Sequence, residues 1–196
     1  MFILVDDEKR ENEGDLIIST TDSSAKNINF MAKYGRGLIC LALDSVQAKR
    51  LNLSLMSPIN QSRNKTAFTI SIEAKKGITT GISAKDRAKT IKIASRKNVN
   101  KKDIVSPGHV FPIIAKDGGV LIRAGHTEAS VDISKLAKKN NKVAFIFGFR
   151  LAELLGREEQ ENWRREVAWL HLEQIPNKTE IASPITELLG TTLPQW

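Results

Sequence analysis

Short apolar runs recur along the first 150 residues, and their spacing distinguishes expected strands from expected helices. Two runs, residues 2–5 and 16–19, flank a strongly acidic segment. Residues 38–43 and 143–149 are continuously apolar, which is typical of buried strands, and residues 67–74 alternate apolar and polar positions, which also predicts a strand. Two further short strands are expected at residues 110–115 and 120–123, joined by a hairpin-like turn at 117–119.

Helical spacing appears between these strands. Residues 20–34 carry apolar side chains at helical intervals and end at a glycine, and residues 127–138 also predict a helix. Ser83 is expected to cap a third helix, with Asp86 three residues later as an acidic variant of the capping box. Strands that alternate with helices predict an α/β (α+β) fold in one domain, with a mixed sheet covered by helices.

The last 47 residues differ in character from the rest. Residues 151–173 are highly charged, and Trp163, Val167 and Leu170 follow at helical spacing, which predicts an amphipathic helix packed on the domain. Residues 176–196 hold three of the six prolines and are expected to be irregular. We therefore divide the chain into one main domain, residues 1–149, and a C-terminal helix and tail, residues 150–196, packed on that domain.

Composition narrows the classes of function. No apolar run reaches 18 residues, so no transmembrane helix is expected, and the N-terminus lacks the basic region of a signal peptide. The single cysteine fits a cytoplasmic location. The net charge of +8 raises nucleic acid as a partner, but residues 6–15 carry −4, and the lysines elsewhere are scattered without interleaved aromatics. We therefore expect neither nucleic-acid nor membrane binding.

The acidic segment 6–15 contains six carboxylates and two basic residues. Such a density of like charge is costly, and a divalent cation would relieve it. Carboxylate oxygens are the ligands that Mg²⁺ and Mn²⁺ prefer. A solvated acidic loop is the alternative interpretation of this pattern.

A second candidate is the stretch from Arg123 to Thr127, at an expected strand-to-helix junction. An arginine, a small-residue turn and a helix N-terminus together suit an anion such as phosphate. His126 would add an imidazole to a metal site. On local grounds alone, Thr127 as a helix cap and His126 as a surface residue explain the stretch equally well.

Two single residues complete the set of candidates. His109 precedes an apolar strand and follows Pro107-Gly108, so it could act as a general acid or base, although a structural histidine is at least as common. Cys40 lies in the apolar run 38–43, where a lone cysteine is usually just buried.

The order and spacing of four motifs resemble one enzyme family. They read DDEKRENEGDLI at 6–17, GLICLAL at 37–43, TTGISAKDRAKTI at 79–91 and SPGHVFPIIAKDGGVLIRAGHTEASVD at 106–132. Together they are similar to 3,4-dihydroxy-2-butanone 4-phosphate synthase, a magnesium-dependent lyase of riboflavin biosynthesis, over roughly residues 2–138.

The resemblance implies a role for individual residues. Glu11 and His126 would bind the metal, Mg²⁺ or Mn²⁺, while Arg10 and Asp15 would contact the substrate and His109 would be essential for catalysis. The implied catalytic residues are His109, Glu11 and Asp15. The implied substrate-binding residues are Arg10, Glu11, Asp15, Arg123, Ala124, Gly125, His126 and Thr127.

The implied reaction converts D-ribulose 5-phosphate to 3,4-dihydroxy-2-butanone 4-phosphate and formate, in a homodimer with interfacial active sites. One implied residue is missing. The family has an essential glutamate in the strand after the last helix, and ungapped counting from His126 places it at Phe147. Three explanations stay open: a damaged reading frame, a branch that uses another acid, or a homologue without activity. We therefore expect slower turnover, or a catalytically impaired homologue that binds sugar phosphate or acts as a dimeric scaffold.

Overall fold

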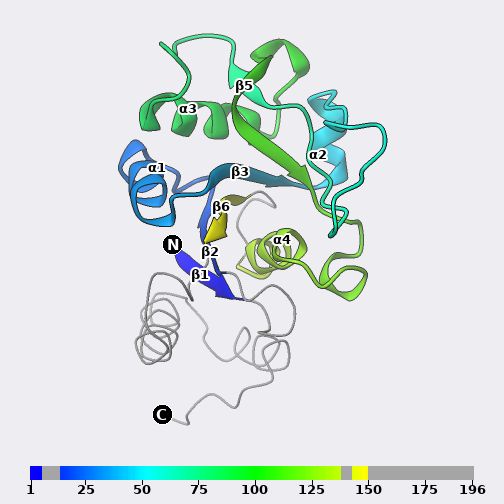
Figure 1. The fold of residues 1–196 in the computed structure, drawn as a ribbon. Helices are drawn as coiled ribbons and strands as arrows, with labels where there is room; N and C mark the ends of the chain where they lie inside the picture. The colour runs from blue at the N-terminus through cyan, green and yellow to red at the C-terminus, as the bar shows by residue number, and fades with distance from the viewer. Residues whose placement is uncertain (6–13, 138–142, 150–196) are drawn as a thin grey trace.

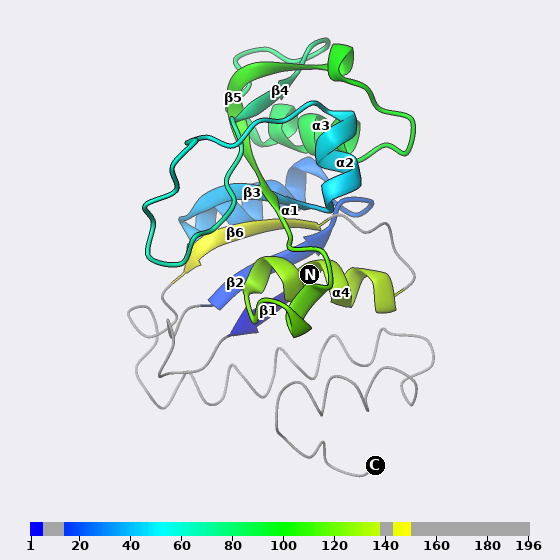
Figure 2. The same cartoon turned by 90° about the vertical axis from the view of Figure 1, so that its right-hand side faces the viewer.

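The computed structural model describes residues 1–5 and 14–137 and the backbone of residues 143–149. Within these residues, six strands form one mixed sheet in the order β1-β2-β6-β3-β5-β4 (Figures 1 and 2). The β3 and β5 strands are parallel, and the other neighbouring pairs are antiparallel. The strands are β1 Phe2–Val5, β2 Gly14–Ser19, β3 Leu38–Leu43, β4 Ile72–Ala74, β5 Ile104–Ile114 and β6 Val143–Phe149.

Helices cover both faces of this sheet. The α1 and α3 helices lie on one face and α4 lies on the other (Figure 1). The helices are α1 Ala25–Phe30, continued by a π-helical turn at Met31–Gly35, α2 Ser45–Arg50, α3 Ala84–Ala94 and α4 His126–Leu136. The expected α/β (α+β) fold, with a mixed sheet between helices, is confirmed.

The central strand β3 explains why its sequence is apolar throughout. Successive side chains of a strand point to opposite faces, and both faces of β3 are covered. Ile39 and Leu41 belong to the core beneath α1 and α3, whereas Cys40 and Ala42 belong to the core beneath α4. All four side chains are buried.

Helix starts follow the predicted capping chemistry. The Ser83 hydroxyl accepts from the backbone N–H of Asp86 at 3.0 Å, so the predicted cap of α3 is confirmed. The helix expected over residues 20–34 begins only at Ala25, because Ser24 is its N-cap and accepts from Asn27 at 3.1 Å. The α2 helix was not predicted because it has only six residues.

The strand expected at residues 120–123 is wrong. Gly118 and Gly119 both have left-handed backbone angles, φ 94° and 65°, which turn the chain into a 3-10 helix at Gly119–Leu121. The carboxylate of Asp132 in α4 accepts from the N–H of Val120 at 2.9 Å and holds this turn against the helix. Two consecutive left-handed residues therefore replace the hairpin, and no strand follows them before α4.

Other boundaries shift less. The strand expected at residues 67–74 is regular only at Ile72–Ala74, although Phe68 makes an isolated bridge with Ile113. The strand expected at 110–115 extends back to Ile104 as β5, and β6 confirms the strand expected at 143–149. The predicted C-terminal helix and tail, residues 150–196, lie outside the described residues, as does most of the acidic segment. Among the described helices, none is long and apolar enough to cross a membrane.

Candidate active site

A buried ion pair joins β2 to the start of α4. The Nδ1 atom of His126 lies 3.0 Å from Oδ2 of Asp15, and the two side chains are 8% and 0% exposed. Asp15 lies on the α4 face of β2, as does its neighbour Ile17. Since a buried carboxylate is costly unless it is paired, the first residue of α4 provides the partner that Asp15 needs. The structure thus brings together two residues that the sequence places 111 positions apart.

Arg123 is fixed beside the N-terminus of α4. Its Nη1 atom donates to Oε2 of Glu128 at 2.6 Å, and Nη2 donates to the carbonyl of Asn64 at 3.0 Å. Glu128 is buried, and its other oxygen accepts from the N–H of Lys116 at 2.9 Å. A Cβ on Gly125 would lie 2.3 Å from Nη1 of Arg123, so only glycine leaves room for this arrangement. The stretch therefore presents an ordered guanidinium next to a helix N-terminus, which suits an anion.

The alternative interpretation of Thr127 as a helix cap is wrong. The helix begins one residue earlier, with Gly125 as its N-cap and no side-chain cap. Thr127 is buried within the first turn. The alternative interpretation of His126 as a surface residue is also excluded by its burial.

His109 lies on β5 and contacts a carboxylate of β4. Its Nδ1 atom is hydrogen-bonded to Oε1 of Glu73, and the side chains of His109 and Glu73 are 42% and 16% exposed. The ladder between β4 and β5 is irregular here: Ile72 pairs with Val110, whereas Glu73 pairs with Val105. The side chain of Glu73 reaches His109 at this irregularity. This pairing could not be predicted from the sequence, because the two residues are 36 positions apart.

His109 and Asp15 lie on strands that are not neighbours in the sheet. The register places Leu16 beside Ile146 and Ile39, and Cys40 beside Phe111. His109 is two positions before Phe111, and Asp15 precedes Leu16 at an irregularity of β2, so the two residues lie at about the same level of the sheet. Their strands are separated by β6 and β3, so three strand spacings, about 14 Å, lie between their backbones.

Cys40 lies on a strand between these groups, but its thiol is not activated as a nucleophile. Burial, and secondarily the negative charge of Asp15, raise the pKa of its thiol well above the ordinary value. A thiol with a raised pKa stays protonated and is a poor nucleophile. The interpretation of Cys40 as a buried core residue is favoured.

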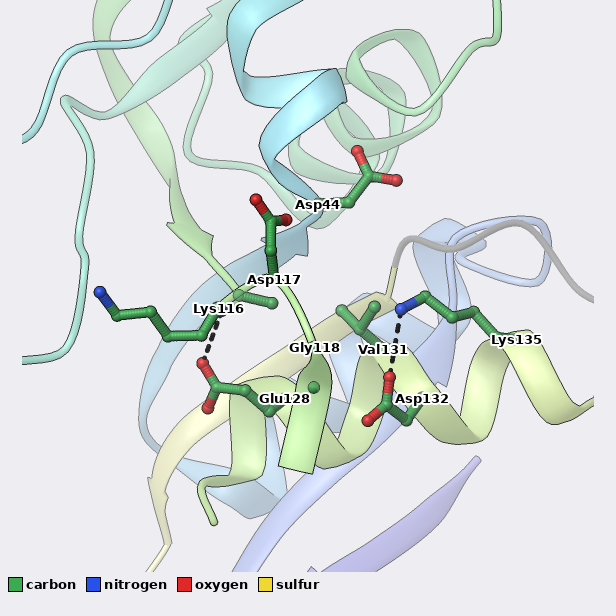
Figure 3. A pocket seen from close by; sticks show the side chains of 10 residues that line it. Asp44, Lys116, Asp117, Gly118, Glu128, Val131, Asp132 and Lys135 are labelled. Carbon is green, nitrogen blue, oxygen red and sulfur yellow. Dashed lines mark hydrogen bonds and ion pairs between the residues drawn. The ribbon is translucent and has the colours of Figure 1, made fainter. Parts of the chain in front are cut away.

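A small pocket opens at the carboxyl ends of β3 and β5 (Figure 3). Figure 3 shows Asp44, Asp117 and Asp132 around it, with the Glu128 carboxylate bonded to the backbone of Lys116. It contains none of the site residues predicted from the sequence. The pocket therefore adjoins the candidate site through Glu128 only.

Comparison with known proteins decides the family. The sequence model described as 3,4-dihydroxy-2-butanone 4-phosphate synthase matches residues 1–163. The chain belongs to the 3,4-dihydroxy-2-butanone 4-phosphate synthase family. A synthase from Photobacterium phosphoreum is 56% identical over 137 residues, which are 70% of this chain and 38% of that protein. The chain thus spans about two-fifths of the length of such curated relatives.

Solved structures of synthases share the fold. The two-domain synthase of A. baumannii matches with a TM-score of 0.76 and 43% identity, over 85% of this chain and 49% of that one. A synthase crystallised with two magnesium ions matches with a TM-score of 0.75 and 33% identity, over 92% of each chain. The resemblance seen in the motifs is confirmed.

The described part of the candidate site has one feature that fits a divalent metal. In metal sites, an imidazole that donates one ring N–H to a carboxylate commonly binds the metal through its other nitrogen. His126, with Nδ1 on Asp15, has that arrangement. The other predicted ligand, Glu11, and its neighbour Arg10 lie outside the described residues, and no group of three metal-binding side chains occurs among the residues that are described.

The backbone register also shows where position 147 lies, the position at which the resemblance implies a glutamate. Phe147 pairs with Leu38 on β3, and on its other side β2 is irregular between Gly14 and Leu16. The backbone of position 147 therefore lies level with Leu38 and beside the irregular part of β2 that contains Asp15. The resemblance implies a glutamate at this position, and the sequence has phenylalanine instead.

Proposed function

We propose that this chain converts D-ribulose 5-phosphate to 3,4-dihydroxy-2-butanone 4-phosphate and formate, as a lyase that depends on a divalent metal, Mg²⁺ or Mn²⁺. The observation that carries the proposal is the buried pair of Asp15 and His126 beside the fixed guanidinium of Arg123. Family membership supports the reaction type, and the magnesium ions in a related synthase structure support the metal.

The chain's residues would divide the work by chemistry. The stretch Arg123–Thr127, with Ala124 and Gly125, would hold the substrate through its guanidinium and the backbone N–H groups of the α4 N-terminus. His126 would hold the metal together with Glu11. A divalent ion there would stabilise the negative charge of an enediolate. Asp15 would orient His126 and contact the sugar phosphate with Arg10, and His109 would exchange protons with the substrate.

We propose a homodimer with interfacial active sites. Within one chain, about 14 Å separates the backbones of Asp15 and His109. Leu121 and Ile122, just before Arg123, are 91% and 68% exposed, which is unusual for large apolar side chains in a monomer. Met56 and Ile59 are also exposed, on the loop that reaches Arg123 through Asn64. A partner surface would cover these side chains.

Mixing two inactive variants tests this arrangement. When His109→Ala and His126→Ala chains are combined in equal amounts, half of the dimers contain one chain of each variant. If each site takes one histidine from each chain, one site of every mixed dimer is intact, which restores about a quarter of the wild-type activity. Sites built within one chain would give no recovery. A monomer in light scattering would also contradict the proposal.

We propose that turnover is slower than in relatives that carry the glutamate. Replacing an acid or base in a proton-transfer site costs about 10²-fold or more in rate. The backbone of position 147 pairs with Leu38, within the part of the sheet that we propose as the site. Phe147→Glu should therefore raise the rate of formate release by about that factor. An unchanged rate in Phe147→Glu would refute the proposal that the absence of this glutamate slows turnover.

A binder of sugar phosphate without turnover, or a dimeric scaffold, is the second candidate, favoured only by the phenylalanine at position 147. Isothermal titration of the chain with D-ribulose 5-phosphate in Mg²⁺, beside the formate assay, separates the candidates. Heat of binding without formate supports the binder. Formate release supports the enzyme.

A further inference from the structure

We infer that the outer face of α3, with the adjoining ends of β4 and β5, binds the phosphate backbone of double-stranded nucleic acid without regard to base sequence. The inference goes beyond the proposed reaction, because it concerns side chains that have no part in it. Its starting point is the distribution of charge. Residues 75–103 carry ten basic and two acidic side chains, a net charge of +8, which equals the net charge of the whole chain.

The basic side chains of α3 form a row on its outer face. Lys85, Lys89 and Lys92 are four and three positions apart, the spacing that places side chains on one side of a helix. All three are exposed, whereas Ile91 packs into the core beneath the helix. Arg96, four positions after Lys92, is also exposed, just beyond the end of the helix. The burial of the apolar side of α3 therefore turns this row outward.

Four more lysines adjoin this row at the edge of the sheet, and all of them are exposed: Lys75, Lys76, Lys101 and Lys102. The N–H of Lys75, just after β4, donates to the carbonyl of Asp103 at 3.0 Å, at the end of the 3-10 turn Lys101–Asp103. A Cβ on Gly77 would lie 1.9 Å from Nζ of Lys89, so the loop after β4 reaches the row on α3. These side chains, with Arg96 and the exposed Lys97, form one surface that we call the basic face.

The two carboxylates of this segment do not neutralise the basic face. Asp86 is buried, and its Oδ2 atom accepts from the backbone N–H groups of Thr79 and Gly81, both at 3.1 Å. Asp103 accepts from the N–H of Asn100 at 3.0 Å and caps the 3-10 turn. Among the residues that the structure describes, no ion pair involves a side chain of the basic face. Its positive charge is therefore free to meet a partner.

The surroundings of the basic face favour a nucleic-acid duplex over other polyanions. Residues 75–110 contain no phenylalanine, tyrosine or tryptophan, so this segment lacks the platforms on which single-stranded bases stack. The apolar side of α3 is buried in the core and cannot enter a bilayer. Charges three and four residues apart on a helix are about 4.5–6 Å apart along its axis. A duplex carries one phosphate per about 1.7 Å of its axis, so every side chain of the row can lie beside a phosphate.

Folding explains why the sequence alone predicts no nucleic-acid partner. Along the chain, the basic residues lie in short groups separated by other residues. The fold brings together groups from the end of β4, from α3 and from the turn before β5, at the edge of the sheet opposite β1 (Figures 1 and 2). Basic side chains gathered on one face are the electrostatic signature of nucleic-acid binding.

Fluorescence anisotropy with labelled 20-base-pair duplexes tests the inference. The probes are DNA and RNA duplexes, each in two unrelated base sequences. We expect a Kd of about 1–100 μM near 0.15 M salt, with no preference between the two base sequences. If the four side chains of the α3 row each neutralise one phosphate, the logarithm of the DNA affinity should fall with the logarithm of salt concentration with a slope of about −3.6.

Two double variants with the same loss of charge separate the basic face from the net charge of the chain. The first is Lys89→Gln with Lys92→Gln, which keeps long side chains on the helix. The control is Lys116→Gln with Lys135→Gln, two exposed lysines beside α4 on the other face of the sheet. The first variant should lower the DNA affinity about 30-fold at 0.15 M salt and reduce the steepness of the slope by about 1.8. The control should keep the slope of the wild type, and circular dichroism should show that both variants are folded.

Each outcome supports or overturns the inference. Binding of only one kind of duplex, weakened by the first variant alone, supports it and identifies the nucleic acid. Absence of binding to both duplexes, or equal slopes in the two double variants, would overturn it. Vesicles that contain phosphatidylserine and an acidic polyglutamate peptide are the remaining probes. If either one binds through Lys89 and Lys92 while the duplexes do not, the basic face serves a membrane or an acidic protein instead, and the inference is wrong.

Discussion

Gly81→Ala should damage catalysis far more than stability. Gly81 has φ +82°, so alanine there costs about 1–2 kcal/mol of folding free energy. Its Cβ would also lie 1.8 Å from Oε1 of Glu73, and ordinary contacts begin near 3.4 Å, so the carboxylate must move by more than an ångström from its place beside His109. Misplacement of that size costs about 10²-fold in rate.

Gly77→Ala is the matched control. Gly77 has φ +72°, and alanine there carries the same conformational cost, but its Cβ would meet only the end of the Lys89 side chain, which can move away. We expect both variants to lose about 1–2 kcal/mol in urea denaturation. In the formate assay, only Gly81→Ala should lose about 10²-fold in kcat. Equal kcat in the two variants would refute the reasoning.

Three further predictions concern the hydrophobic core, the carboxylate of Asp86 and the position of Arg123. Ile91→Ala, in the fully buried centre of α3, should cost about 2–5 kcal/mol in denaturation, whereas Ile82→Ala at a half-exposed position should cost less than about 1 kcal/mol. The pKa of Asp86 is lower in the folded chain than its ordinary value, so its charge stabilises the fold at neutral pH. This stabilisation is lost as the pH falls through the folded pKa. The Tm difference between wild type and Asp86→Asn should therefore be present at pH 7 and shrink below about pH 4. Gly125→Ala should raise KM for the sugar phosphate by displacing Arg123, measured by formate kinetics, and an unchanged KM would contradict the role of Arg123.

Much of the fold follows from local patterns. The run at Leu38–Leu43 is apolar because both its faces are covered, and the cap at Ser83 is encoded by neighbouring residues. The turn after Lys116 was wrongly predicted as a hairpin, because its conformation depends on Asp132 in a later helix as well as on its two glycines. Hydrophobic periodicity identifies helices and strands, whereas the conformation of a turn also depends on residues far away in the sequence.

The site was predictable to the same extent. Asp15, His109, Arg123 and His126 belong to motifs that can be seen in the sequence, and the structure pairs Asp15 with His126. The two carboxylates that hold His109 and Arg123 were missed. Glu73 reaches His109 only through the irregular pairing of β4 with β5. Glu128 follows the predicted stretch directly, but its burial, which makes it an anchor for Arg123, is a property of the folded chain.

The most direct test of the proposed function is formate release from D-ribulose 5-phosphate by the purified chain, with Mg²⁺ and with EDTA. Asp15→Asn, which removes one charge of the buried pair, provides the background. The proposal predicts formate and the four-carbon phosphate in equal amounts, dependent on Mg²⁺ and faster in Phe147→Glu. Formate release by neither the wild type nor Phe147→Glu above the Asp15→Asn background would contradict it.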